Sequence, residues 1–467
     1  MLFKNVFRTL KARYVQLILL GVIITLSSFI YTTMTYSMDG IIGPTDDYFE
    51  EANQEDFSIS MLDFVLEDDL VFITENCPVM LTIAPENFPI TLSGIKEIDK
   101  PCFDQLIDNR LSIIESKYDN IDLEIRESKD VYFENDNESF RIRFLKDMDL
   151  INTSYFVAGS KPTADNDIAV AEIFAKNNDL DINDILSING KDYTVTGYVL
   201  FPDYSLSLFS QELILDNASQ TMGLLTDEEF ENLSQAVSFE VAGVYLNDYT
   251  AKEFEEDVID TYREDDDLSY ITNVMLTINN MRSGAIYAEL AGGRAQSILL
   301  SLMIASIALM IVGIMVSRVL HSQRGPIGIL KSMGYTNNQI TMPYIFFIAI
   351  MSLPMILLGY FLGLLMANPF MEIYLDFYLL PSQPIVQSFS VILVAIIVPF
   401  TFTVGLSYLI VRRLLIQKPV VLLNPEVTSS SNFLTKYVAK YLKRFKITTK
   451  LQHLLLYRSL VKFSVYF

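Results

Sequence analysis

The stretch Ala295–Ser317, AQSILLSLMIASIALMIVGIMVS, contains no ionisable residue and decides the class of the fold. It is longer than the ~20 residues with which a helix crosses ~30 Å of hydrocarbon. Three similar runs lie at Tyr14–Tyr36, Met342–Ala367 and Phe389–Val411. The first is too long for a signal peptide and has no small-residue cleavage site behind it, so we interpret it as a retained anchor. The sequence therefore predicts an α-helical membrane protein with four transmembrane helices, which we place at residues 14–37, 294–317, 342–367 and 389–411.

Charge is divided unequally along the chain. Residues 38–293 hold 54 of the 57 Asp and Glu but only 15 of the 34 Lys and Arg, which gives this block a net charge of −39. The rest of the chain carries +16. Short loops rich in Lys and Arg stay in the cytoplasm, whereas long acidic domains cross the membrane. We therefore expect residues 38–293 and the turn 368–388 to be extracellular. Residues 1–13, an amphipathic helix, the loop 318–341 and the basic tail 412–467 are expected to be cytoplasmic.

The segment between the first two spans is long enough for a core of its own. Lys191–Val199 alternates between apolar and polar residues as a strand does, and Ile188–Lys191 supplies a hairpin turn before it. Glu172–Asn178 and Glu228–Val237 have the composition of short helices. Strands mixed with helices predict a large extracellular α+β domain between the first and second transmembrane helices.

The acidity of this domain has two interpretations. One is a solvated surface that keeps the domain soluble, and the other is a site for a cationic ligand. The densest acidic run, Glu253–Asp267, lacks the glycine and the ligand spacing of an EF-hand loop, which argues against calcium.

The chain has two cysteines, Cys77 and Cys102, and both fall in the acidic domain. A disulfide between them would contribute about 3 kcal/mol by closing the intervening loop. The alternative is a pair of free buried thiols. The sequence leaves both possibilities open.

Several chemistries lack the residues that they need. There is no G-x-x-x-x-G-K-[ST] motif to cradle nucleotide phosphates. The two histidines, His321 and His453, both lie outside the acidic domain, which argues against a zinc site or a Ser–His–Asp triad there. Spans without ionisable residues do not support a proton or sodium relay. We expect no catalytic residue, cofactor, metal or nucleic-acid partner, and we infer that an energy-supplying partner acts from the cytoplasm.

The loop 318–341 is where such a partner would dock. Pro326 can start a short helix, Gly334 can end it, and Thr336 can cap the helix that follows. The result would be a rigid helical elbow with apolar side chains available to a partner's groove. The alternative is an ordinary basic loop that rests on lipid headgroups. The candidate coupling residues are Arg324, Pro326, Ile327, Ile329, Leu330, Lys331, Met333 and Gly334.

The run Ile327–Ile340, IGILKSMGYTNNQI, resembles the signature of FtsX-like (MacB-type) ABC transporter permeases. Gly325-Pro326 stands where that family usually has a basic–acidic pair. Gly159–Pro202 resembles the outer core domain of the family, and Gln417–Pro425 resembles the segment after its fourth span. The order of one span, a large outer domain and three further spans also matches.

This resemblance implies a permease that pairs with a cytoplasmic ABC ATPase and with a second permease copy or half, among membrane lipids. ATP-driven motion of the ATPase would pass through the elbow and the spans to the outer domain, so ATP hydrolysis would lie in the separate partner. Two functions stay open: export or extraction of a lipoprotein, lipid or peptide, and a sensor or regulator of an extracellular partner such as a cell-wall hydrolase or of antimicrobial-peptide signalling. The low cysteine count and the acidic domain favour a Gram-positive plasma membrane.

The C-terminal tail resembles the start of another membrane unit. Tyr457–Leu460 echoes Phe7–Leu10, and both follow basic amphipathic stretches. We therefore expect this chain to be the first half of a two-unit permease, with Thr428–Asn432 as linker. The alternative is a basic interfacial helix that ends the protein.

Overall fold

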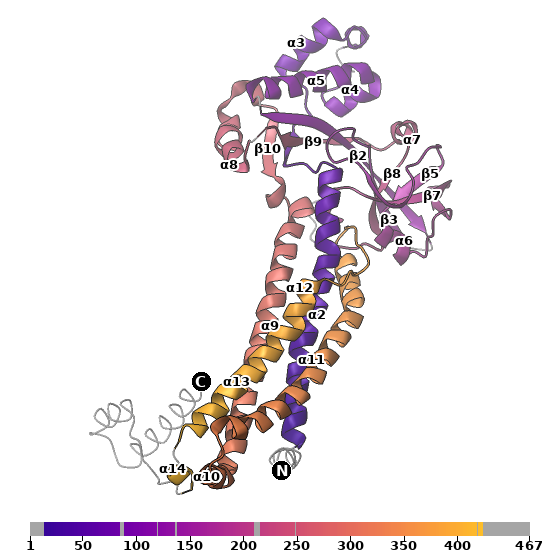
Figure 1. Ribbon diagram of the computed structural model, residues 1–467. Helices are drawn as coiled ribbons and strands as arrows, with labels where there is room; N and C mark the ends of the chain where they lie inside the picture. The colour runs from indigo at the N-terminus through magenta and orange to yellow at the C-terminus, as the bar shows by residue number, and fades with distance from the viewer. Residues whose placement is uncertain are drawn as a thin grey trace, which may run out of the picture. The chain divides into compact units, whose positions relative to one another are not determined.

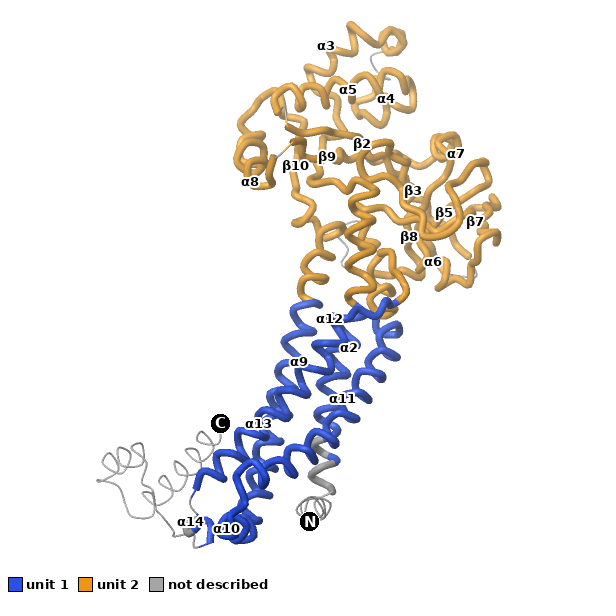
Figure 2. The backbone as a smooth tube through the Cα atoms, viewed as in Figure 1, with its two compact units in different colours: residues 1–37, 293–370, 385–467 blue, residues 38–292, 371–384 orange. Residues whose placement is uncertain are grey.

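The computed structural model describes residues 14–84, 88–118, 120–135, 138–209, 215–247, 249–417 and 419–423. The chain divides into two compact units (Figure 2). The membrane unit comprises Met1–Ser37, Gly293–Phe370 and Ile385–Phe467, and the sheet unit comprises Met38–Gly292 and Met371–Pro384. The expected amphipathic helix at 1–13, the linker at 428–432 and the tail beyond residue 423 lie outside the described residues.

Long helices make up the membrane unit (Figure 1). Three of them, α2, α9 and α11, continue past the predicted spans and contribute residues to both units. A π-helical turn at Leu393–Ile397 joins α12 to α13. The helix bounds are α2 Tyr14–Glu51, α9 Met281–Ser322, α10 Arg324–Ser332, α11 Asn337–Leu375, α12 Phe389–Ile392, α13 Val398–Leu415 and α14 Pro419–Leu423.

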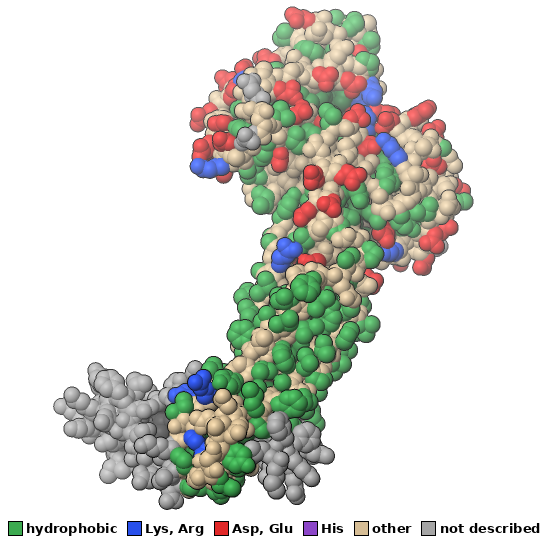
Figure 3. Space-filling view, in the orientation of Figure 1, with side chains coloured by type: hydrophobic (Ala, Val, Ile, Leu, Met, Phe, Trp, Pro, Cys, Tyr) green, Lys and Arg blue, Asp and Glu red, His purple; other side chains and the backbone are tan. Residues whose placement is uncertain are grey.

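Within the described residues, three helical segments are long and apolar enough to cross a membrane: Met281–Ser322, Asn337–Leu375 and Phe389–Leu415. Hydrophobic side chains cover most of the visible face of the membrane unit (Figure 3). The predicted first span, residues 14–37, forms the beginning of α2 but is not among these three segments. The count of four transmembrane helices therefore stays a prediction.

Helix α11 packs closely on α2 through two glycines one turn apart. A Cβ atom at Gly359 would lie 2.3 Å from the carbonyl oxygen of Thr25, and one at Gly363 would lie 2.6 Å from Cβ of Thr32. Ser37 donates a 2.7 Å hydrogen bond to the carbonyl of Ala367 farther along the same pair of helices. Small residues at a spacing of four allow such close helix packing in membranes.

The sheet unit is built on one mixed sheet, ten-stranded within the described residues, in the order β10-β1-β9-β2-β3-β8-β5-β7-β4 with β6 paired to β7. The β3–β8 and β5–β7 pairs are parallel, and the other pairs are antiparallel. The strands are β1 Phe57–Met61, β2 Ile121–Asn135, β3 Glu138–Leu145, β4 Tyr155–Gly159, β5 Asp167–Val170, β6 Ile185–Ile188, β7 Lys191–Leu200, β8 Gln220–Leu224, β9 Ser238–Tyr245 and β10 Ile271–Leu276.

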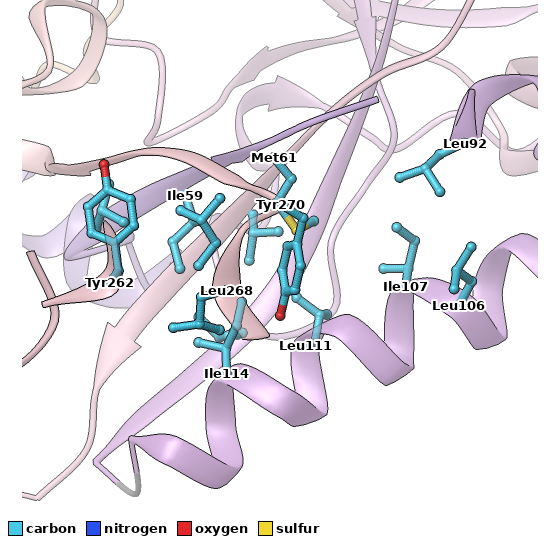
Figure 4. Packing of buried hydrophobic residues seen from close by; sticks show 14 of the residues in the cluster. Ile59, Met61, Leu92, Leu106, Ile107, Leu111, Ile114, Tyr262, Leu268 and Tyr270 are labelled. Carbon is cyan, nitrogen blue, oxygen red and sulfur yellow. The ribbon is translucent and has the colours of Figure 1, made fainter. Parts of the chain in front are cut away.

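One core of the sheet unit lies between helices and the β1–β9–β10 part of the sheet. Leu106, Ile107, Leu111 and Ile114 recur at helical spacing along α5 and point toward the strands (Figure 4). The helices of this unit are α3 Glu67–Asn76, α4 Leu92–Ile98, α5 Lys100–Lys117, α6 Glu172–Asn177, α7 Asp227–Asn232 and α8 Ala251–Phe254. A second core fills the space between α6, α7 and the strands β2, β3, β5, β6 and β7.

Of two local predictions for the sheet unit, the hairpin is confirmed and the length of one helix is wrong. The hairpin forms as β6 and β7, and its turn residues Asn189 and Gly190 both have positive φ, as a type I′ turn requires. The predicted helix 228–237 is too long, because α7 ends at Asn232. Leu233 is already extended, residues 234–237 form no helix, and the chain then enters β9, which pairs with β2 from Ser238 onward.

Cys77, at the end of α3, and Cys102, in the first turn of α5, form a disulfide with Cα atoms 5.5 Å apart. Asp and Glu side chains are spread over the visible face of the sheet unit (Figure 3). Part of the predicted turn 368–388 also joins this unit, because Leu379 donates a backbone hydrogen bond to Ser205 and Gln383 donates one to Gly40.

Candidate coupling site

The elbow between α9 and α11 is a helix with defined ends. Tyr335 N–H donates to Leu330 O and Gly334 N–H donates to Lys331 O, which is the Schellman pattern at the end of α10. Gly334 has φ +91°, a conformation that glycine adopts without strain. Thr336 then caps α11 by accepting from Gln339 N–H, and the Gln339 side chain accepts from Thr336 N–H in return.

Helix α10 starts two residues before Pro326, at Arg324. Pro326 is therefore the third helical residue rather than the first. The position still tolerates proline, because the N–H groups of the first turn have no intrahelical acceptor.

One face of α10 is buried inside the membrane unit. Ile327 is 1 % exposed and packs in the cluster formed by the ends of α9, α11 and α13. Leu330 is half-buried against the same cluster. A Cβ atom at Gly328 would lie 3.0 Å from Cγ of Leu423, so glycine lets α14 approach closely. These contacts attach α10 to the rest of the unit.

Lys331 ties α10 to the end of α13. Its ammonium group donates to the carbonyls of Leu415, at 2.5 Å, and Gln417, at 2.7 Å. The last carbonyls of a helix lack partners within that helix and carry partial negative charge, so a lysine there is stabilising. The structure thus gives Lys331 an internal bracing contact that sequence reasoning did not find.

The opposite face of α10 is open. Pro326 and Ile329 in α10, and Met333 directly after its last residue, follow one another at spacings of three and four, which places them on one side of the elbow. Ile329 is 54 % exposed and Met333 is 70 % exposed. We call Pro326, Ile329 and Met333 the open face. Arg324 is half-buried at the start of the helix, beside this face in sequence.

The candidate residues therefore separate into two groups that the sequence did not distinguish. Ile327, Leu330 and Lys331 hold the elbow, and the open face is available to a partner. The distinction depends on α13 and α14, which come roughly 70 to 95 residues later in the chain. Among the described residues, no group of three or more His, Cys, Asp or Glu side chains converges to hold a metal ion.

Within the described residues, three apolar helices long enough to cross a membrane indicate a membrane protein. Residues 298–419 match the model of the FtsX-like permease C-terminal family. This part of the chain is therefore similar to the C-terminal domain of FtsX-like permeases, and the open face lies inside the matched region. No curated protein matches the chain.

Proposed function

We propose that this chain is a permease subunit that relays the motion of a cytoplasmic ABC ATPase to its sheet unit. The observation that carries this proposal is the open face on a helix whose other side is anchored. A partner that binds Ile329 and Met333 can transmit force only if α10 is firmly attached to the rest of the membrane unit. The contacts of Ile327, Gly328 and Lys331 provide that attachment. Helices α2, α9 and α11 contribute residues to both units, so motion of the membrane unit can pass to the sheet unit along continuous helices.

The proposed topology puts the N-terminus and the elbow in the cytoplasm and the sheet unit outside. It rests on the excess of Lys and Arg in the short loops. We also propose that this membrane is the plasma membrane of a Gram-positive bacterium.

Labelling with a membrane-impermeant thiol reagent checks this topology. In a chain without Cys77 and Cys102, cysteines at Asp46, Asp203 and Ser382 are expected to lie outside, although Asp203 is 1 % exposed and needs partial unfolding to react. Asp46 and Ser382 are exposed and should be modified on intact cells. Cysteines at Ser322 and Gln417, also exposed, should react only after the cells are opened. Modification at Ser322 on intact cells would place the elbow outside and overturn the model.

The favoured activity is export or extraction of an amphipathic substrate. A cavity of about 440 Å³ in the membrane unit supports it, because the walls are mostly apolar side chains of α2, α9 and α13. A few hydroxyl groups, such as those of Ser27 and Ser301, also line this cavity. The runner-up is a sensor or regulator of an extracellular partner, for which the exposed acidic surface of the sheet unit is the supporting feature (Figure 3).

Purification of the intact complex from its native membrane tests the proposed function. An ABC ATPase should accompany the chain at a fixed ratio, together with a second permease copy or half. A complex with membrane or extracellular proteins but without an ATPase, isolated under conditions that preserve other ABC complexes, would contradict the relay.

A further inference from the structure

The sheet unit contains a cavity of about 380 Å³ that the relay does not use. The residues that line it include the aromatic residues Phe49, Tyr245 and Tyr287 and the acidic residues Glu55 and Asp56. The cavity also borders Ala251, the first residue of α8, which is exposed. Carboxylates beside aromatic faces form a typical environment for an organic cation.

Glu55 is the unusual residue of this cavity, because it is buried without full compensation. It is 3 % exposed. Its Oε2 accepts a 2.9 Å hydrogen bond from the side chain of Asn152, whereas its Oε1 has no hydrogen-bond partner. The nearest cation is Arg282, with Nη2 3.9 Å from Oε1, and that same Nη2 is 2.9 Å from Glu240. A buried acceptor without a donor is costly, so a donor supplied by a ligand would be favourable here.

Neighbouring groups support this picture. The Tyr245 hydroxyl is buried and also lacks a hydrogen-bond partner. Asp56 is held in place by a 2.8 Å hydrogen bond from Tyr245 N–H, and Tyr287 donates to Gln54. The acidic composition of the unit would raise the local concentration of cations.

We propose that this cavity binds the ammonium or guanidinium group of a basic peptide side chain, with Glu55 as the principal acceptor. The proposal deepens the proposed function by naming the substrate class, a peptide that carries lysine or arginine. An organic cation fits better than a metal ion, because two carboxyl groups and aromatic walls do not make a coordination shell. The described residues contain no cluster of three or more metal-ligating side chains.

The protonation state of Glu55 makes the proposal testable by pH. Burial and the charges of Asp203 and Glu240 raise the pKa of Glu55, Arg282 and Asn152 oppose the rise, and the net result is a pKa of about 8. Asp203 is itself paired with Arg126, and burial also raises the pKa of Asp56. Below pH 8 a bound ammonium must displace the Glu55 proton. Affinity should therefore rise between pH 6.5 and 8.5, by up to roughly tenfold per unit, while the lysine ammonium stays charged.

Saturation-transfer NMR on the full chain in lipid nanodiscs provides the measurement. Acetyl-lysine-amide should bind at pH 8.5, and acetyl-norleucine-amide, which lacks the charge, should bind about tenfold more weakly. Glu55→Gln should weaken lysine binding by a similar factor at pH 8.5 and by less at pH 6.5. This variant should fold, because the wild-type carboxyl is largely neutral at pH 7.

Ala251→Trp tests the same cavity without touching its acid. The indole should obstruct the cavity and reduce binding, while Lys252→Trp, at an exposed neighbour with no part in the lining, should not. Equal binding of the norleucine analogue, unchanged binding in Glu55→Gln, or displacement of the lysine probe by micromolar calcium would overturn the proposal. None of these measurements involves the ATPase, so failure here leaves the relay intact, and failure of the native complex to contain an ATPase leaves this site intact.

Discussion

Ile329→Asp and Met333→Asp should each abolish ATPase docking while the permease still folds and inserts. Apolar anchors at the centre of a small interface carry most of its binding energy, and a buried carboxylate without a partner costs about 2–4 kcal/mol, or at least roughly 30-fold in affinity. Both side chains are exposed, so neither substitution disturbs the membrane unit itself. Co-purification of the ATPase and stimulated ATP turnover are the measurements.

The matched control is Asn338→Asp, which adds the same charge at an exposed position in the first turn of α11, outside the open face. It should leave docking unchanged. Equal losses in Asn338→Asp and Met333→Asp would show that the elbow responds to charge alone, as a basic loop on headgroups would.

Leu330 and Lys331 are expected to behave differently from the open face. Leu330→Asp would place a charge against the cluster that anchors α10, so it should destabilise the elbow as well as docking. Lys331→Met removes two hydrogen bonds to the end of α13. We expect that variant to retain ATPase binding but to lose part of the stimulated turnover, because the helix that receives the force is less firmly held.

The second large effect is expected from Gly359→Ala. The new methyl group would lie 2.3 Å from the carbonyl oxygen of Thr25, so α2 and α11 must move apart. Overpacking of this kind costs about 1–3 kcal/mol, even though alanine favours the helix more than glycine does. The thermal denaturation midpoint of the purified chain in detergent should fall by several degrees.

Gly405→Ala is the control, because a Cβ atom there meets nothing within 4 Å and the residue lies in α13 of the same unit. It should be neutral or slightly stabilising. Equal midpoints for the two variants would mean that α2 does not pack closely on α11, and would weaken the case for α2 as a fourth transmembrane helix.

The sequence could predict the parts of this fold that depend on local patterns. Apolar runs locate the long helices of the membrane unit, Gly334 and Thr336 mark the end of α10 and the start of α11, and Asn189-Gly190 marks a hairpin. Each of these signals acts within a few residues, where backbone preference decides the conformation.

The sequence could not predict which side of the elbow is buried. Ile327 and Ile329 are chemically alike, and only the packing of α13 and α14 makes the first an anchor and the second an open side chain. The bracing contact of Lys331, one of the candidate coupling residues, could not be predicted either, because its carbonyl acceptors lie more than eighty residues away in sequence. Still longer separations in sequence hide the surroundings of Glu55, whose carboxyl group lies next to Asn152 and Arg282. The G-x-x-x-G spacing at Gly359 and Gly363 was the one usable signal that was missed.

Photocrosslinking from α10 tests the central claim most directly. A benzoylphenylalanine residue at Met333, in the full chain within its native membrane, should form an adduct with a cytoplasmic ABC ATPase on illumination. The same residue in place of the exposed Asn338, outside the open face, should form much less of that adduct. An adduct of equal yield at both positions, or adducts at Met333 with lipid alone, would contradict the claim that the open face binds the ATPase.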